Sequence, residues 1–137
     1  MTNKTEALFK LTAPYNNPYQ GDDRRLLFVC SAGLLRSATG ANLYAKKGYN
    51  TRNCGTHEYA LIPLSMNLLA WAHSIIFVNS ENYYDALEKF KGTNGYGELT
   101  EKSITLDIPD NFEYNNSKLI EIMEEQLAEY HDKGFRH

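Results

Sequence analysis

The residues best suited to chemistry lie in one short stretch, Cys30-Ser31-Ala32-Gly33-Leu34-Leu35-Arg36-Ser37, between an apolar run at 26–29 and a segment of helical character. Backbone N–H groups in such a loop, and at the start of the helix, can converge on an anion, and the helix dipole adds positive potential there. Arg36 supplies a planar fork of donors for two phosphate oxygens. The stretch therefore predicts a phosphate-binding loop. Its binding residues are Ser31, Ala32, Gly33, Leu34, Leu35 and Arg36.

Cys30, the first residue of this loop, is the candidate nucleophile. The positive field around the loop favours its thiolate, which can attack phosphorus and form a cysteinyl-phosphate intermediate. Ser37 can hydrogen-bond the sulfur and make Cys30 a better leaving group in the second step. The alternative is an ordinary buried strand cysteine with Arg36 as a surface charge. The position of the stretch between a strand and a helix favours the chemical interpretation.

The composition suits one compact globular domain. The chain has 137 residues, of which 42% are hydrophobic and 23% charged. A net charge of −3 with scattered basic residues argues against nucleic acid as a partner. We expect neither a secretory signal nor a membrane span, and hence a cytoplasmic location. The two cysteines lack metal-ligand spacing and are expected to be free thiols.

Strands that alternate with helices must position the loop. Strands are expected at 26–29, 49–54, 74–78 and 103–106. Helices are expected over 37–47, from Pro63 to Trp71, from a cap at Ser80 onward, and over 119–130, with a flexible connection at 91–102. Residues 1–22 are predicted to form a polar extension that precedes an α/β domain at 23–137. Ligands of a parallel sheet bind beyond the carboxyl ends of its strands, and Cys30 lies at one such end.

The stretch from Cys30 to Ser37 resembles the phosphate-binding loop of the low-molecular-weight protein tyrosine phosphatases, and more closely that of the short bacterial proteins described as predicted protein tyrosine phosphatases. The segments 53–56, 70–78 and 106–110 also look like parts of that family, so the resemblance covers about residues 24–130. It implies a three-layer, flavodoxin-like fold, in which a four-stranded parallel sheet carries helices on both faces. It also implies that no metal or organic cofactor is used.

The resemblance implies a role for each matched residue. Cys30 is then the nucleophile, Arg36 the phosphate clamp and Ser37 the hydroxyl that assists the thiolate. The family's general acid, an Asp normally followed by Pro, falls on Asp110. In this chain the next residue is Asn111, and Asp107 is the reserve candidate for the acid. Either carboxyl group meets the physical requirement if its loop reaches Cys30.

The loop also departs from the family pattern. Ala32, Gly33 and Leu35 stand where the classical loop has Gly, Asn and a second Cys. Gly33 can adopt a positive φ without the asparagine clamp. Loss of the second loop cysteine leaves Cys54 either as a substitute disulfide partner or as an isolated buried thiol. Arsenate reductases of this fold need later cysteines, and none follows Cys54, so that activity is disfavoured.

Substrate contacts are predicted from aromatic side chains. Phe112 and Tyr114 are placed to flank a phosphotyrosine ring after the general acid, and Tyr59 offers another wall. Packing in the core or on the surface is the alternative for each of them. His57 lies either at the mouth of the pocket or in solvent.

Three functions follow from these features. The first is a phosphatase acting on phosphotyrosine or a related small phosphate monoester, whose partners are a phosphorylated protein or small ester and inorganic phosphate, with no nucleic acid or membrane. The second is a catalytically impaired phosphate-binding or phosphoprotein-binding module of the same fold. The third is a phosphocysteine carrier, which Arg36 and a candidate general acid disfavour. A nucleophilic thiol favours the enzyme, because anion binding alone does not need one.

Overall fold

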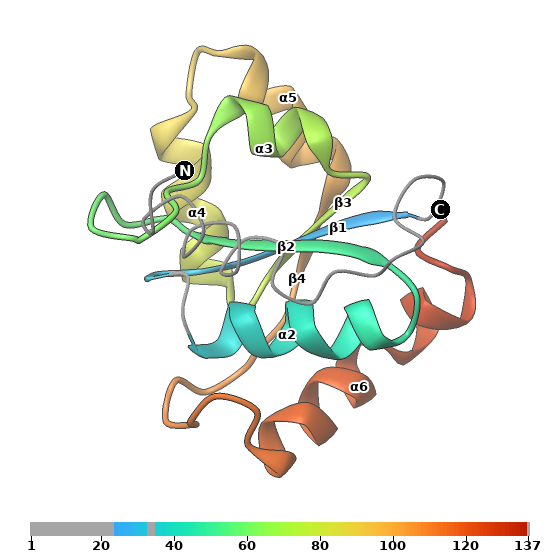
Figure 1. Cartoon of the computed structure of the whole chain (residues 1–137). Helices are drawn as coiled ribbons and strands as arrows, with labels where there is room; N and C mark the ends of the chain where they lie inside the picture. Colours follow the sequence, from blue (N-terminus) through green and yellow to red (C-terminus); the bar gives the residue numbers. More distant parts are fainter. Residues whose placement is uncertain (1–23, 33–34, 137) are drawn as a thin grey trace, which may run out of the picture.

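The computed structural model describes residues 24–32 and 35–136, so the predicted extension at 1–22 lies outside the described residues. Four parallel strands form one sheet in the order β2-β1-β3-β4, as Figure 1 shows. They are β1 (Arg25–Cys30), β2 (Asn50–Gly55), β3 (Ser74–Phe77) and β4 (Ser103–Thr105). The predicted four-stranded parallel sheet is therefore confirmed, and Cys30 ends its β1 strand.

Helices cover both faces of the sheet. One face carries α2 (Leu35–Lys46) and α6 (Ser117–Asp132), and the other carries α3 (Met66–Trp71), α4 (Ser80–Lys89) and α5 (Asn94–Lys102) (Figure 1). Two hydrophobic clusters result, one on each face. This arrangement confirms the predicted three-layer flavodoxin-like architecture.

Strand β1 lies at the centre because its side chains are apolar on both faces. Leu26 and Phe28 belong to the cluster under α2 and α6, whereas Leu27 and Val29 belong to the cluster on the other face. All four are fully buried, as expected for a parallel strand covered on both sides. Helix α2 packs directly on this strand at Gly40, where any Cβ would overlap the Phe28 ring. The middle of α2 is thereby held close against β1.

The prediction of a flexible connection at 91–102 is wrong, because most of this segment forms α5. Thr93 caps the helix by accepting a hydrogen bond from the Gly95 N–H at 3.1 Å. Gly95 packs so closely on Met66 and Phe90 that a side chain would not fit, and Leu99 is fully buried. The glycines that suggested a loop instead allow α5 to lie close to its neighbours.

Three helix starts also differ from the prediction, and the first is that of α2, which begins at Leu35 rather than at residue 37. Helix α3 begins at Met66, after the cap residue Ser65, while Pro63 forms an isolated bridge with Gly55. Asn79, rather than Ser80, caps α4, because the Asn79 side chain can accept the Asn82 N–H at 3.0 Å.

The predicted final helix is confirmed, with Leu119, Met123 and Leu127 fully buried.

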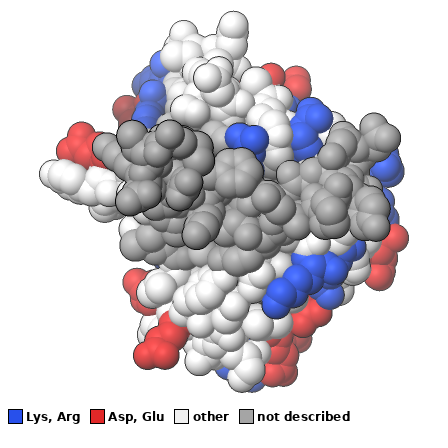
Figure 2. Space-filling view, in the orientation of Figure 1, with Lys and Arg blue, Asp and Glu red and all other residues white. Residues whose placement is uncertain are grey.

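No helix in the described part of the chain combines the length and the apolar character needed to span a membrane. The face seen in Figure 2 carries both basic and acidic side chains among its described residues.

Candidate active site

A small cavity lies at the carboxyl end of β1. Its volume is about 190 Å³, and it is lined by Cys30, Ser31, Ala32, Leu35, Arg36 and Asp110. The cavity brings the start of the predicted phosphate loop together with Asp110, which is 80 residues further along the chain. Gly33 and Leu34, also predicted to bind phosphate, lie outside the described residues.

The sulfur of Cys30 lies next to a serine hydroxyl. Its Sγ is 3.1 Å from the Oγ of Ser37, and both residues are buried. Ser37 is in the first turn of α2, which begins at Leu35, so the sulfur also lies near the positive end of a helix dipole. A hydroxyl that donates to the sulfur stabilises negative charge on it. This geometry suits a thiolate that is alternately nucleophile and leaving group.

The first residues of the loop are held by their neighbours. The Cys30 carbonyl accepts the Thr56 N–H at 2.9 Å, and the Ser31 carbonyl accepts the His57 N–H at 3.0 Å. The close approach requires Gly55, because a Cβ there would lie 2.7 Å from the carbonyl carbon of Ala32. The segment after β2 therefore fixes the backbone at the start of the loop.

Asn82 adds a side-chain contact that the sequence analysis did not anticipate. From the first turn of α4, its Nδ2 donates to the Oγ of Ser31 at 2.9 Å, and only 1% of the residue is exposed. The two residues are 51 positions apart, and the pairing of β1 with β3 brings their segments together. The one signal in the sequence is an asparagine in the first turn after a buried strand.

Arg36 links the loop to the segment that carries Asp110. Its Nη1 donates to the Ile108 carbonyl at 2.9 Å, and the residue is 91% buried. A guanidinium has five N–H donors, and this bond uses one of them. Arg36 thus retains donors for an anion in the cavity that it lines.

The two candidate acids have different surroundings. Asp110 lines the cavity with Cys30. Asp107 does not line the cavity, although both acids are exposed. The Asp107 backbone is held to α6 by two hydrogen bonds of 2.8 Å, one from its N–H to Gln126 and one from the Gln126 amide to its carbonyl. The geometry favours Asp110 over Asp107 as the group next to the sulfur.

Cys54 lies on the opposite side of the sheet from Cys30. In the β1–β2 register Cys54 is opposite Val29, and it packs in the cluster under α3 and α4, whereas Cys30 belongs to the cluster under α2 and α6. Neither cysteine is in a disulfide. Burial, and secondarily the nearby Cys30, raise the pKa of the Cys54 thiol. These features match an isolated buried cysteine better than a disulfide partner.

The predicted aromatic walls do not line this cavity. Phe112 is half-buried and packs on the hydrophobic cluster around α6, while Tyr114 and Tyr59 are 40% and 85% exposed. His57 is exposed in the loop after β2. None of these four residues is among those that line the cavity. Contact of Phe112 or Tyr114 with a substrate ring stays a prediction.

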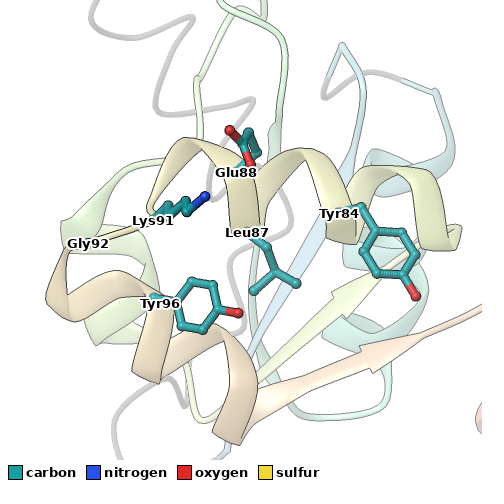
Figure 3. A pocket seen from close by; sticks show the side chains of 6 residues that line it. All are labelled: Tyr84, Leu87, Glu88, Lys91, Gly92 and Tyr96. Atoms are coloured by element: carbon teal, nitrogen blue, oxygen red, sulfur yellow. The ribbon is translucent and has the colours of Figure 1, made fainter.

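A larger hollow of about 450 Å³ lies between α4 and α5 (Figure 3). It is lined by Tyr84, Leu87, Glu88, Lys91, Gly92 and Tyr96. These residues include no thiol and no arginine, so the hollow lacks the pair of groups found at Cys30 and Arg36. The smaller cavity is therefore the candidate active site.

Comparison of the whole structure with solved structures identifies the same fold in bacterial phosphatases. The YwlE arginine phosphatase from Geobacillus stearothermophilus is 20% identical, with a TM-score of 0.62 over 80% of this chain and 94% of that chain. A low-molecular-weight protein tyrosine phosphatase from Bacillus subtilis is 18% identical, with a TM-score of 0.61 over 82% of this chain and 99% of that one.

A third solved structure of this fold is a YwlE arginine phosphatase mutant that carries a phosphorylated active-site serine. It is 18% identical, with a TM-score of 0.60 over 80% of this chain and 96% of that chain. The sequence alone matches no protein-family model and no curated protein. The structural likeness establishes the fold that the low-molecular-weight phosphatase resemblance implied.

Proposed function

We propose that this chain, which has the fold of the low-molecular-weight phosphatases, is a cysteine-dependent phosphatase that hydrolyses phosphotyrosine or a related phosphate monoester. The observation that carries the proposal is the shared cavity of Cys30, Arg36 and Asp110, with the sulfur 3.1 Å from the Ser37 hydroxyl. These groups supply a nucleophile, a clamp, an acid and a stabiliser of the leaving thiolate.

In the first step the Cys30 thiolate attacks phosphorus while Arg36 and the loop N–H groups hold the phosphoryl oxygens. An S–P bond forms and the P–O bond to the leaving group breaks. The carboxyl group of Asp110 gives its proton to the departing oxygen, so the alcohol leaves uncharged. The chain is left with a phosphorylated Cys30 and an ionised Asp110.

In the second step the Asp110 carboxylate takes a proton from water as the water oxygen attacks phosphorus. The S–P bond breaks, inorganic phosphate forms, and the Cys30 thiolate is regenerated. The Ser37 hydroxyl stabilises the departing sulfur, which lowers the barrier to this displacement. The cycle needs no group beyond the residues at the cavity and one water molecule.

A second candidate substrate is phosphoarginine, because two of the structural neighbours described above are arginine phosphatases. The same residues would break a P–N bond, with Asp110 protonating the leaving nitrogen. The apolar part of the described cavity wall comes from Ala32 and Leu35, which do not distinguish an aryl ring from an alkyl guanidinium. The choice between the two substrates therefore rests on experiment.

The competing binding module would keep the anion site without turnover. Binding alone requires Arg36 and loop N–H groups, whereas it gives no reason for a thiol paired with a hydroxyl or for a carboxyl group in the same cavity. A carboxylate beside a bound phosphate lowers affinity by charge repulsion unless it is protonated. The presence of Asp110 therefore supports hydrolysis over phosphate binding alone.

Steady-state hydrolysis of p-nitrophenyl phosphate, a phosphotyrosine peptide and phosphoarginine, measured from pH 5 to 8, tests the proposal. Cys30→Ala is expected to abolish activity, and Asp110→Asn to reduce it about 10²–10⁴-fold on substrates that need an acid. Asp107→Asn is the matched control, because it makes the same change three residues away on a carboxyl group outside the cavity. A native chain inactive on all three substrates that still binds vanadate through Arg36 would support the binding module instead.

A further inference from the structure

Helix α2 carries a row of buried polar side chains at a spacing of three residues. Arg36, Thr39 and Asn42 are 9%, 0% and 5% exposed. Buried polar groups in a helix normally have specific hydrogen-bond partners, and removal of a partner destabilises the fold. All three side chains contact a single segment, the loop 106–116 between β4 and α6, which carries Asp110.

The contacts fix this loop on both sides of Asp110. Before it, the Ile108 carbonyl accepts the Arg36 guanidinium at 2.9 Å. After it, the Asn115 N–H donates to the Thr39 hydroxyl at 2.9 Å, and the Asn42 amide donates to the Asn115 side chain at 3.2 Å.

The Thr39 hydroxyl is oriented by a second bond. It donates to the Leu35 carbonyl at 2.7 Å, so its lone pairs are directed at the loop. Asn115 has φ of 56°, in the left-handed region that asparagine tolerates better than most residues. The next residue, Asn116, caps α6 by accepting the Lys118 N–H at 2.9 Å. One asparagine thus fastens the loop to α2, and the other begins the last helix.

We propose that Thr39, Asn42 and Asn115 are positioning residues that hold Asp110 at the reacting group in the cavity. This inference rests on the proposed function. Helix α2 then organises both halves of the site, since its first turn lies at the phosphate loop and its buried side fixes the acid loop. A general acid works only within hydrogen-bond reach of the leaving atom, so a loop released at Asn115 spends less time in the productive arrangement.

The dependence of rate on the leaving group isolates this role. A good leaving group such as p-nitrophenolate departs with little help, whereas phenolate needs the proton from Asp110. We therefore compare kcat/KM for the two esters in three variants, Asn115→Gly, Asn42→Ala and Thr39→Val. For phenyl phosphate, kcat/KM is expected to fall roughly tenfold or more in each variant. For p-nitrophenyl phosphate, it is expected to fall less than about threefold. Asn115→Gly keeps the backbone N–H and accommodates the positive φ, so it removes only the side-chain contact.

Two controls separate positioning from stability. Thr51→Val removes another buried hydroxyl that bonds α2, through the Ala41 carbonyl at 2.8 Å, without touching the acid loop. It is expected to lower the melting temperature as much as Thr39→Val does and to leave the ratio of the two rates unchanged. Asn115→Asp keeps a side-chain acceptor for Asn42 and is expected to retain the native ratio.

A double-mutant cycle completes the test. If Asn115 acts through Asp110, then Asn115→Gly has little further effect on phenyl phosphate hydrolysis in an Asp110→Asn background. Equal losses on both esters, or an undiminished effect in that background, would overturn the positioning role while leaving the proposed phosphatase intact. A native chain that hydrolyses neither ester would instead overturn the proposed function, and the positioning role with it.

Discussion

Cys30 and Cys54 lie on neighbouring strands and face opposite sides of the sheet. Cys30 is in register with Gly55, and Cys54 with Val29, so the two side chains belong to different hydrophobic clusters. A disulfide needs Cβ atoms about 3.5–4.5 Å apart on converging bonds, which this arrangement does not provide. Cys30, the proposed nucleophile, is therefore expected to lack protection by Cys54.

The first prediction concerns oxidation of the protein by hydrogen peroxide. Cys30 is expected to form a sulfenic acid that persists or oxidises further, without an intramolecular disulfide. Mass spectrometry of unreduced peptides checks this outcome. Cys54→Ser should be inactivated at the native rate and should recover activity with thiol to the same extent. A crosslinked peptide containing both cysteines would contradict the placement of the two thiols.

The second prediction concerns Gly55, where β2 meets the phosphate loop. An added Cβ would lie 2.7 Å from the carbonyl carbon of Ala32, and backbone atoms there cannot move aside without moving the loop. Gly55→Ala is expected to cost about 1–3 kcal/mol of unfolding free energy and to weaken competitive inhibition by inorganic phosphate.

The matched control is Gly97→Ala in α5, where nothing lies within 4 Å of an added Cβ. This change should stabilise the helix by about 0.5–1 kcal/mol, since alanine loses less backbone entropy than glycine. Its phosphate inhibition constant should match that of the native chain. Equal phosphate binding in the two alanine variants would show that the close approach at Gly55 does not shape the loop.

The third prediction concerns the hydrogen bond from Asn82 to Ser31. Asn82→Ala and Ser31→Ala each remove one partner of this buried bond and should each weaken vanadate binding. Because the two residues contact each other, the double variant is expected to lose less than the sum of the single losses, by about 0.5–3 kcal/mol. Vanadate dissociation constants for the four proteins give this coupling. Strict additivity would mean that the contact does not support the loop.

The fourth prediction concerns pH and His73, at the opposite end of the sheet from Cys30. Burial, together with the charges of Arg24, Arg25, Lys102 and Arg136, lowers the pKa of His73. Its Nδ1 also accepts the Arg25 N–H at 2.9 Å, a bond that protonation there would break.

A lowered folded-state pKa means that the unfolded chain binds more protons, so the free energy of unfolding falls as pH drops through the unfolded value of about 6.5. The loss continues down to the folded-state pKa. His73→Asn keeps an acceptor for Arg25 without titrating, and it should flatten the urea-unfolding free energy between pH 7 and 5. A slope equal to that of the native chain would assign the pH dependence to other groups.

Much of the fold could be predicted from the sequence because its two central strands, β1 and β3, are largely apolar runs. Leu26 to Val29 predicts a strand buried on both faces, and the stripe of Leu119, Met123 and Leu127 predicts a packed helix. Helix α5 was not predicted because glycine, judged from the local sequence alone, suggests a loop. In the structure, Gly95 instead allows close packing against Met66 and Phe90. That use of glycine depends on neighbours distant in the sequence.

The candidate site likewise has one part that the local sequence predicts and another that depends on distant contacts. Local order shows that Cys30 precedes a helix with Arg36 near its start, so that half could be predicted, although α2 begins at Leu35 rather than at the expected residue 37. The roles of Asn82, Thr39 and Asn42 depend on contacts made 51 to 76 residues away, which composition and periodicity do not encode. One signal was available, the spacing of three that places Arg36, Thr39 and Asn42 along one side of α2.

The most direct test of the account is capture of the phosphorylated enzyme. The native chain, mixed with a phosphotyrosine peptide or phosphoarginine and quenched during turnover, is expected to carry a phosphoryl group on Cys30 that peptide mass spectrometry can locate. Cys30→Ala, treated in the same way, should carry no phosphoryl group. Turnover without label on Cys30, or with equal label in Cys30→Ala, would contradict a cysteinyl-phosphate mechanism.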